Sequence, residues 1–209
     1  MMEFYEVLEK RRTYRNFSDR EVSDEILNRI INAAFKAPTN DHLRQFEFVV
    51  VRGQENIAKV IAPLAKNMAA FRELVFEVDE SGDKDKMAMF ADALPKQQKM
   101  LMESGLLILP FFHQQTCPLL HPVEQSSLNY FASAWCALEN MLLAATAEGL
   151  GAVFHIPVSD EAEKIKEIVG APKDYEFTCL LTIGYPSENA FLPKQKIVNV
   201  GERIHRNMW

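Results

Sequence analysis

The chain has 209 residues, 48% of them hydrophobic, and a formal net charge of -6 at pH 7, which favours a globular protein with a substantial core over a disordered one. The acidic balance argues against a nucleic-acid-binding protein with a broad basic face, and no apolar run approaches the roughly 20 residues that span a bilayer. The three cysteines are far apart and the N-terminus lacks the apolar core of a signal peptide, so we expect a cytoplasmic protein without disulfides.

The first half of the chain predicts two helices, a strand and a mostly helical middle. Apolar residues share one face of a short helix over 4–11, and Ser23 is a typical N-cap for a second helix, which Pro38 ends. "FEFVVV" (46–51) predicts a strand. Residues from about 55 to 103 predict helices interrupted by "ESGDKDK". This middle part carries several methionines, for which core or dimer packing is favoured over an adaptable substrate cover: Met68, Met87, Met89, Met100 and Met102.

The second half alternates apolar strands with helices. A long buried helix is predicted from the 3–4 spacing of apolar residues after residue 127, and Gly149 closes it. Ser159 caps a further helix that ends at Gly170. Residues 105–112 predict a buried strand, 151–156 a strand or an extended segment, and 177–186 a strand that runs into a turn. We therefore predict a single mixed α+β domain over residues 1–209, with a small sheet covered by helices; the element order permits parallel pairs and leaves the topology open.

Two patterns of reactive residues also have simpler interpretations. His113, Cys117 and His121 are spaced by four, as metal ligands on one helix face would be. Prolines in and beside this stretch make a continuous helix unfavourable, so we favour an irregular loop without a metal. Cys136 and Cys179 lie in apolar segments and are predicted to be small core residues rather than nucleophiles.

Basic residues gather near both ends of this acidic chain. "EKRRTYRNFSD" places three arginines and a hydroxyl within five positions, and "LPKQK" adds two lysines near the C-terminus. Guanidinium, ammonium and hydroxyl groups are the donors that a phosphate binds. The alternatives are solvated surface cations or a favourable charge at a helix C-terminus. The paired clusters favour a small anionic ligand.

Four blocks in this order resemble the flavin-dependent nitroreductases over nearly the whole chain. "RRTYRNFSDREVSDEILNRIINAAFKAPTN" is similar to that family's opening, and "FEFVVV" to the strand that follows. "LENMLLAATAEGLGAVFHIPV" resembles its central helix with a small-residue end, and "PKDYEFTCLLTIGYP" its final strand and turn. The resemblance implies a central, mostly antiparallel sheet flanked by helices in an intertwined homodimer, whose C-terminal extension, here about 187–209, reaches the partner subunit.

The resemblance also implies chemistry. FMN would bind at the dimer interface and pass electrons from NADH or NADPH to a small acceptor, such as a nitroaromatic or a quinone, in a ping-pong reaction. Arg11, Arg12 and Thr13 would hold the phosphate, and Arg15 would lie nearer the ring. The other positions that the resemblance assigns to the cofactor are Pro38, Thr39, Asn40 and His42 from the partner subunit, Phe154, His155, Ile156 and Pro157 beside the ring, and Lys194 or Lys196 at the phosphate.

The chain departs from the family pattern next to the proposed ring site. "APTNDHLRQF" stands where many members have "APSSxNxQPW", so that His42 replaces Asn, as in members resembling iodotyrosine dehalogenases, and Arg44 replaces a neutral amide. Pro157 stands where many members have Gly and removes one backbone donor. These departures keep three alternatives open: a flavin- or nucleotide-binding module without turnover, a reductive dehalogenase, and a flavin-degrading enzyme.

Overall fold

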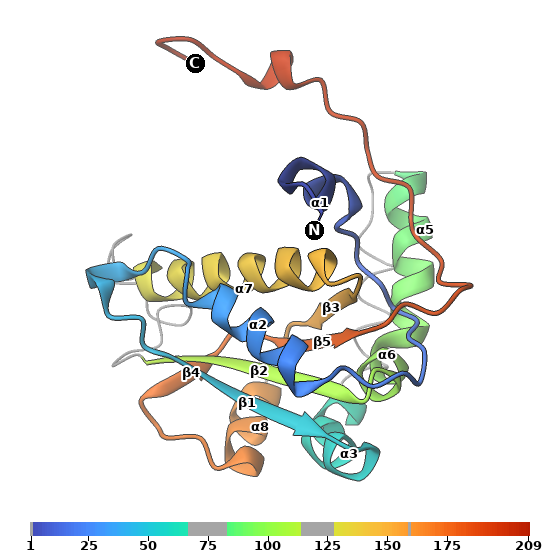
Figure 1. Ribbon diagram of the computed structural model, residues 1–209, viewed down its shortest axis with the longest axis vertical. Helices are drawn as coiled ribbons and strands as arrows, with labels where there is room; N and C mark the ends of the chain where they lie inside the picture. The colour runs from blue at the N-terminus through green and yellow to red at the C-terminus, as the bar shows by residue number, and fades with distance from the viewer. Residues whose placement is uncertain (1, 67–82, 114–127, 159) are drawn as a thin grey trace.

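The computed structural model describes residues 2–66, 83–113, 128–158 and 160–209 (Figure 1). The helices are α1 (Phe4–Lys10), α2 (Asp24–Ala34), α3 (Gln54–Ile61), α5 (Lys84–Ala93), α6 (Gln97–Glu103), α7 (Asn129–Ala147) and α8 (Glu161–Val169). The strands are β1 (Phe46–Arg52), β2 (Leu106–His113), β3 (Gly151–His155), β4 (Tyr175–Phe177) and β5 (Leu180–Gly184). The α+β prediction is therefore confirmed.

The strands form one antiparallel sheet in the order β1-β2-β5-β3, and β4 also pairs with β2. The strand that runs into a turn, predicted over 177–186, corresponds to β5, but the strand is interrupted near its start, because β4 ends at Phe177 and β5 begins at Leu180. Thr178 lies opposite Pro110 and donates its N–H to the Pro110 carbonyl at 3.2 Å. Proline has no N–H to return, so the ladder breaks there and one extra residue is accommodated, as in a β-bulge.

The central strand β2 is buried on both faces, which explains its unbroken apolar run. Leu106 and Ile108 belong to the cluster under α2 and α7, whereas Leu107 and Leu109 belong to the cluster under α3, α6 and α8. Successive side chains of a strand point to opposite faces, so a strand between two helical layers needs apolar residues at every position. Figure 1 shows these layers, with α2 and α7 on one side of the sheet and α3 and α8 on the other.

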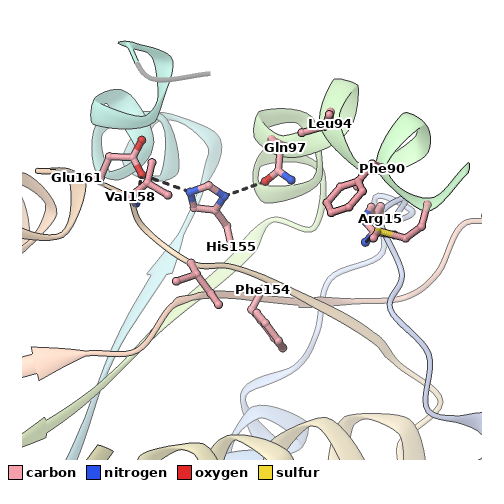
Figure 2. Close-up of a pocket in the computed structure, with 11 residues that line it drawn as sticks. Arg15, Phe90, Leu94, Gln97, Phe154, His155, Val158 and Glu161 are labelled. Carbon is pink, nitrogen blue, oxygen red and sulfur yellow. Dashed lines mark hydrogen bonds and ion pairs between the residues drawn. The ribbon is translucent and has the colours of Figure 1, made fainter. Parts of the chain in front are cut away.

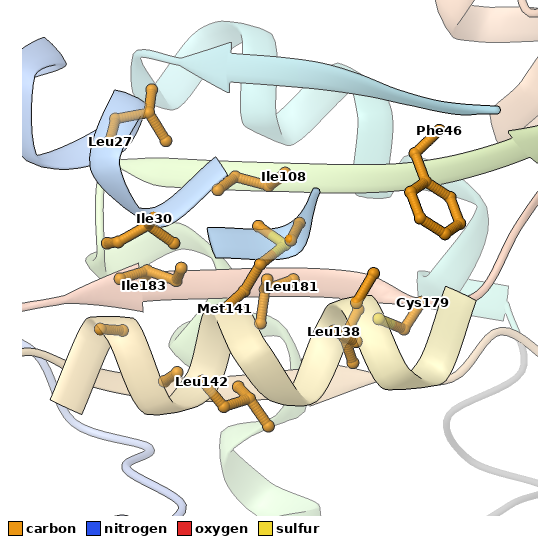
Figure 3. Packing of buried hydrophobic residues seen from close by; sticks show 14 of the residues in the cluster. Leu27, Ile30, Phe46, Ile108, Leu138, Met141, Leu142, Cys179, Leu181 and Ile183 are labelled. Carbon is orange, nitrogen blue, oxygen red and sulfur yellow. The ribbon is translucent and has the colours of Figure 1, made fainter. Parts of the chain in front are cut away.

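The long helix α7 packs on the face of the sheet that also carries α2 (Figure 3). Leu138, Met141 and Leu142 face the sheet and pack with Leu27 and Ile30 of α2 in one buried cluster. The prediction that Cys136 is a core residue is wrong, because it lies on the exposed side of α7. The apolar pattern of α7 extends around its axis beyond the face that this chain buries.

The predicted helix ends agree with the structure, with one exception. The Ser23 hydroxyl accepts from the N–H of Ile26 at 3.3 Å, and Gly170 ends α8 in the left-handed conformation with φ of 68°. Helix α2 ends at Ala34, where the N–H of Lys36 turns back to the Ala33 carbonyl, so Pro38 follows the end rather than causing it. The proposed Ser159 cap lies outside the described residues, and Asp160 is the N-cap residue of α8.

The C-terminal segment 187–209 leaves the body of the protein. It passes along α5 and continues beyond α1 with little regular structure (Figure 1). Its apolar side chains face solvent in this single chain, as Ile197 is 95% exposed and Trp209 is 102% exposed. Its contact with a partner subunit stays a prediction. No helix in the described ranges has both the length and the apolarity to cross a membrane.

Candidate functional site

A cavity of about 230 Å³ lies between the N-terminal segment, α5, α6 and the end of β3. Its wall is mostly apolar, with Phe90 from α5 and Phe154 from β3 among the lining residues (Figure 2). Charged and polar groups enter it from other elements: Arg15, Gln97, His155 and Glu161. An apolar cavity with a few convergent polar groups is the usual form of a small-molecule site.

The arginine-rich segment reaches this cavity because it runs beside β3. After α1 ends, Thr13 forms a parallel bridge with Ala152, and the N–H of Tyr14 donates to the Ala152 carbonyl at 3.1 Å. The approach is close at Gly151, where an added Cβ would lie 2.7 Å from Cβ of Tyr14. Only glycine fits there without displacing the segment.

Arg15 is held at one side of the cavity by α5. Its side chain is 11% exposed, with Nη1 3.7 Å from Oδ2 of Asp92 and Nη2 3.7 Å from Sδ of Met89. Burial lowers the pKa of Arg15, and the negative charge of Asp92 acts in the opposite direction. Asp92 also pairs with Lys96, whose ammonium group donates to Oδ1 of Asn16 at 2.8 Å. The cation is thus fixed by a network rather than by one partner.

His155 joins three elements at the other side of the cavity (Figure 2). Its Nδ1 lies 2.8 Å from Oε1 of Gln97 on α6, and its Nε2 lies 3.5 Å from Oε2 of Glu161 on α8. The same Glu161 oxygen accepts the N–H of Val158 at 2.8 Å. Burial lowers the pKa of His155, and the Glu161 carboxylate partly offsets this effect.

The remaining predicted phosphate residues lie around the same segment. Arg11 approaches Glu139 of α7, with 3.9 Å between Nε and Oε1, and Arg12 donates to the carbonyl of Pro193 in the C-terminal segment. Lys194 follows Pro193 directly and is exposed, whereas Lys196 pairs with Asp83 before α5. The contact between Arg12 and Pro193 therefore joins the arginine-rich segment to the C-terminal segment that carries the two lysines, and their role at a phosphate stays a prediction.

The predicted group Pro38, Thr39, Asn40 and His42 does not line the cavity of its own chain. It lies near the start of α7, where the N–H of Asn40 donates to Oγ of Ser133 at 2.9 Å. His42 has φ of 56° and Arg44 has φ of 47°, left-handed values that are uncommon for residues other than glycine. This separation agrees with the expectation that these residues act from the partner subunit, which stays a prediction.

The described residues of the metal and cysteine patterns do not line this cavity. Cys117 and His121 of the metal hypothesis lie outside the described residues, and His113 pairs with Asp174 at 3.0 Å. Within the described ranges no three His, Cys, Asp or Glu side chains form a metal-binding group. Burial raises the pKa of Cys179 to about 12, so its thiol stays protonated at neutral pH. The core prediction for Cys179 is confirmed.

The methionines of the middle part of the chain do not share one role. Met100 is buried in the core, as favoured from the sequence, whereas Met89 lines the cavity and contacts Arg15. Met68 lies outside the described residues.

Comparison with known proteins identifies the family of this chain. The model of the nitroreductase family matches residues 8–185. The chain belongs to the nitroreductase family. It is similar to an archaeal relative from Methanothermobacter thermautotrophicus with the provisional name NADH dehydrogenase/NAD(P)H nitroreductase, at 29% identity over 100% of this chain and 88% of the relative. It is also similar to the iodotyrosine deiodinase of Hydra vulgaris, at 29% identity over 93% of this chain and 69% of that protein.

Among solved structures, this nitroreductase-family chain resembles oxidised iodotyrosine deiodinase bound to FMN and 3-iodo-L-tyrosine. The TM-score is 0.72 at 19% identity, with 99% of this chain and 100% of the other covered. At this identity the likeness concerns the fold, and it confirms the nitroreductase-like architecture.

The sequence did not predict several residues that lie at or beside the cavity. Phe90, Gln97 and Glu161 line the cavity, and Asp92 pairs with Arg15. All four come from helices whose placement depends on the folded chain. In the sequence, Glu161 is recognisable only as an acidic residue in the first turn of a helix. Acidic residues are common at that position and do not indicate a binding site. Asp92 and Lys96 are spaced by four, the spacing of an ordinary surface ion pair.

Proposed function

We propose that this protein is an FMN-dependent oxidoreductase that passes electrons from NADH or NADPH to a small acceptor such as a nitroaromatic or a quinone, in a ping-pong reaction. The observation that carries the proposal is the shared cavity. Arg15, from the arginine-rich segment, and residues 154–156, from the end of β3, line it together although they are about 140 positions apart. The sequence resemblance assigns both segments to the flavin.

The donor set suits the phosphate end of FMN. Arg11, Arg12 and Thr13 follow one another on the segment beside β3, and each offers a donor that a phosphate accepts. The Pro193 carbonyl occupies one donor of Arg12, and the guanidinium group retains others. We favour Lys194 over Lys196 as the C-terminal phosphate cation, because Lys194 adjoins Pro193 while the ammonium group of Lys196 is engaged by Asp83.

The ring end of the site suits a flat, largely apolar group with a polar edge. Phe154 stands edge-on to Trp135, with 5.4 Å between the ring centroids, on the α7 side of β3. When bound, FMN would supply the hydride-transfer chemistry, and the chain would orient the ring and set its electrostatic surroundings. Arg15 would favour negative charge on the ring, because a buried, pre-positioned cation stabilises developing charge strongly.

A homodimer would complete the site. Phe4 and Tyr5 of α1 are 60% and 79% exposed, and apolar side chains of the C-terminal segment are also exposed among the described residues. Such surfaces are typical of protein interfaces. The partner subunit's copies of residues 38–42 would then approach the flavin, which explains why they lie away from the cavity of their own chain.

The test begins with the purified protein. We expect a yellow protein whose bound flavin is identified as FMN by mass, or an apoprotein that takes up added FMN stoichiometrically. A folded protein that remains colourless and takes up no FMN would contradict the proposal. Oxidation of NADH or NADPH with a panel of acceptors, above the rate of free flavin, would eliminate the alternative of a binding module without turnover.

Reductive dehalogenation is a second candidate function, favoured by the similarity to iodotyrosine deiodinase. The sequence resemblance also places His42 where members resembling iodotyrosine dehalogenases carry His. Halophenols and halotyrosines should be assayed beside nitroaromatics and quinones with the same reduced protein. Halide release at a higher kcat/KM than any other acceptor supports this candidate. Halide release no faster than with free reduced flavin eliminates it.

A further inference from the structure

Glu161 is a buried carboxylate for which the proposed electron transfer has no direct use. It is the first residue of α8 and only 2% exposed, yet it lines the cavity. A carboxylate withdrawn from water must be compensated by hydrogen bonds. Its Oε2 accepts the N–H of Val158 at 2.8 Å and lies 3.5 Å from Nε2 of His155. These contacts direct it toward the segment between β3 and α8.

The contacts of Glu161 extend into a clamp on this segment, formed by Gln97, His155, Val158 and Glu161. Gln97 fixes the imidazole of His155 from α6, at 2.8 Å from Nδ1, and Glu161 meets its other nitrogen from α8. Val158 is tied to the same carboxylate through its backbone. The chain from 155 to 158 is therefore held at both ends (Figure 2).

Between these two ends the segment has few backbone donors. Pro157 has no N–H, and the N–H of Val158 is taken by Glu161. The N–H of Ile156 makes no hydrogen bond with any described residue, and Ile156 lines the cavity. The clamp thus leaves one donor of this segment available for a ligand.

We propose that Glu161 is a positioning residue, which holds residues 155–158 through Val158 and His155 so that the N–H of Ile156 is fixed as a hydrogen-bond donor to the flavin ring. This inference rests on the proposed FMN function. The benefit is entropic, because a donor that is ordered before binding does not have to be ordered by the ligand. Glu161 itself makes no contact with the ring in this proposal.

The first arm of the test uses hydrogen exchange of the protein without FMN. Glu161→Ala removes the acceptor for Val158, so the backbone amide of Val158 should exchange faster than in the wild type. Glu161→Gln retains an acceptor oxygen and should restore slow exchange. Glu163→Ala is the matched control, because Glu163 lies on the same helix with its side chain 70% exposed. Unchanged exchange in folded Glu161→Ala would overturn the proposal.

The second arm measures FMN itself by fluorescence titration and by the visible spectrum of the bound flavin. Glu161→Ala should weaken FMN binding about fivefold or more, the effect of ordering about one residue on binding, and should move the absorption bands toward those of free FMN. Glu161→Gln should recover both, and Glu163→Ala should match the wild type. Faster exchange with unchanged FMN affinity and spectrum would reduce Glu161 to a structural role and overturn the proposal.

A third variant keeps the test decisive if Glu161→Ala does not fold. Gln97→Ala removes the partner of His155 on the opposite side and leaves the buried carboxylate intact. Gln97→Ala should weaken FMN binding about threefold, as expected for one neutral hydrogen bond, and should shift the flavin spectrum in the same direction as Glu161→Ala. Unchanged FMN affinity and an unchanged spectrum would contradict the proposed clamp. A wild-type protein that binds no FMN would instead refute the proposed function on which the inference rests.

Discussion

Arg12 is the residue for which phosphate binding and a simple helix-end role differ most clearly. It follows the last turn of α1, where any cation is favourable, but its guanidinium group reaches across to the Pro193 carbonyl. That contact orients it beside Thr13 and the C-terminal segment rather than toward the helix. The phosphate role of Arg12 stays a prediction.

Replacing Arg12 tests this role. Arg12→Ala should weaken FMN binding by about 1.5–3 kcal/mol, the range for a hydrogen bond to a charged group. The measurement is a fluorescence titration of the apoprotein with FMN. Lys10→Ala is the control, because Lys10 is a nearby cation of α1 that pairs with Glu6 on the surface. Equal affinities for Arg12→Ala and the wild type would leave Arg12 as a helix-end charge.

His155 makes stability depend on pH. Burial lowers its pKa below the ordinary value of 6.5, so the unfolded chain binds the proton more readily than the folded one. The free energy of unfolding should therefore decrease as the pH falls through about 6.5 toward the lower pKa of the folded state. Denaturant unfolding at pH 7.5 and pH 5.5 should show this loss, and His155→Gln should make it smaller. A wild type that is more stable at pH 5.5 would contradict the assignment.

The sequence predicted some of the residues of the candidate site. Arg15 and residues 154–156 do share a cavity, and Lys194 lies in the segment that Arg12 contacts. Gln97 and Glu161 could not be identified, because hydrogen bonds across 58 and 6 positions meet at His155 only after α6 and α8 are placed on the sheet. Pattern reasoning locates charged clusters along the chain but does not show which helix will cover them.

At the scale of elements, the decisive contact is the N-terminal segment lying against β3. Gly151→Ala should force Tyr14 and its neighbours away from β3, because the new Cβ would lie 2.7 Å from the Tyr14 side chain. We expect a loss of about 1–3 kcal/mol in the free energy of unfolding, with weaker FMN binding. Denaturant unfolding and FMN titration check the two effects.

The control for this change is Gly170→Ala. Gly170 has φ of 68° at the end of α8, with open space around an added Cβ, so alanine there should cost stability through backbone strain alone. FMN affinity should be unchanged in Gly170→Ala. If both variants lower FMN affinity equally, general destabilisation rather than displacement of the segment explains the effect.

Most elements were predictable because their local signals agree with their burial. The apolar periods of α2 and α7 and the run in β2 correspond to faces that the fold buries. The break between β4 and β5 was missed, because it depends on Pro110 of a strand about 70 positions away. Strand order and direction also depend on pairing partners that no local pattern specifies.

At the scale of the whole molecule, the C-terminal segment should control both assembly and cofactor binding. A chain ending after Phe191 keeps the hydrogen bond between the N–H of Ser187 and the Asn16 carbonyl, but loses Pro193, the lysines and the exposed apolar residues. We expect this truncated chain to fold as a monomer with weak FMN affinity, while the full chain is a dimer. Sedimentation and FMN titration of both proteins provide the measurement.

A shorter truncation, which removes only 207–209, is the control for nonspecific effects and should retain the dimer. A full-length chain that sediments as a monomer would contradict the assembly proposed for the site. A dimeric protein ending at Phe191 would show that α1 and the exposed side of α7 suffice for association without the C-terminal segment.

The antiparallel sheet has a consequence for how the chain folds during synthesis. Its central strand β2 pairs with β1 over residues such as Phe46 and Phe112, and with β5 over Leu107 and Thr182, so each pairing joins distant parts of the chain. Sheets built from distant pairings fold slowly, because long loops must close first. Until residue 184 has left the ribosome, one edge of an apolar strand has no partner. We expect refolding to be slow and prone to aggregation at high protein concentration.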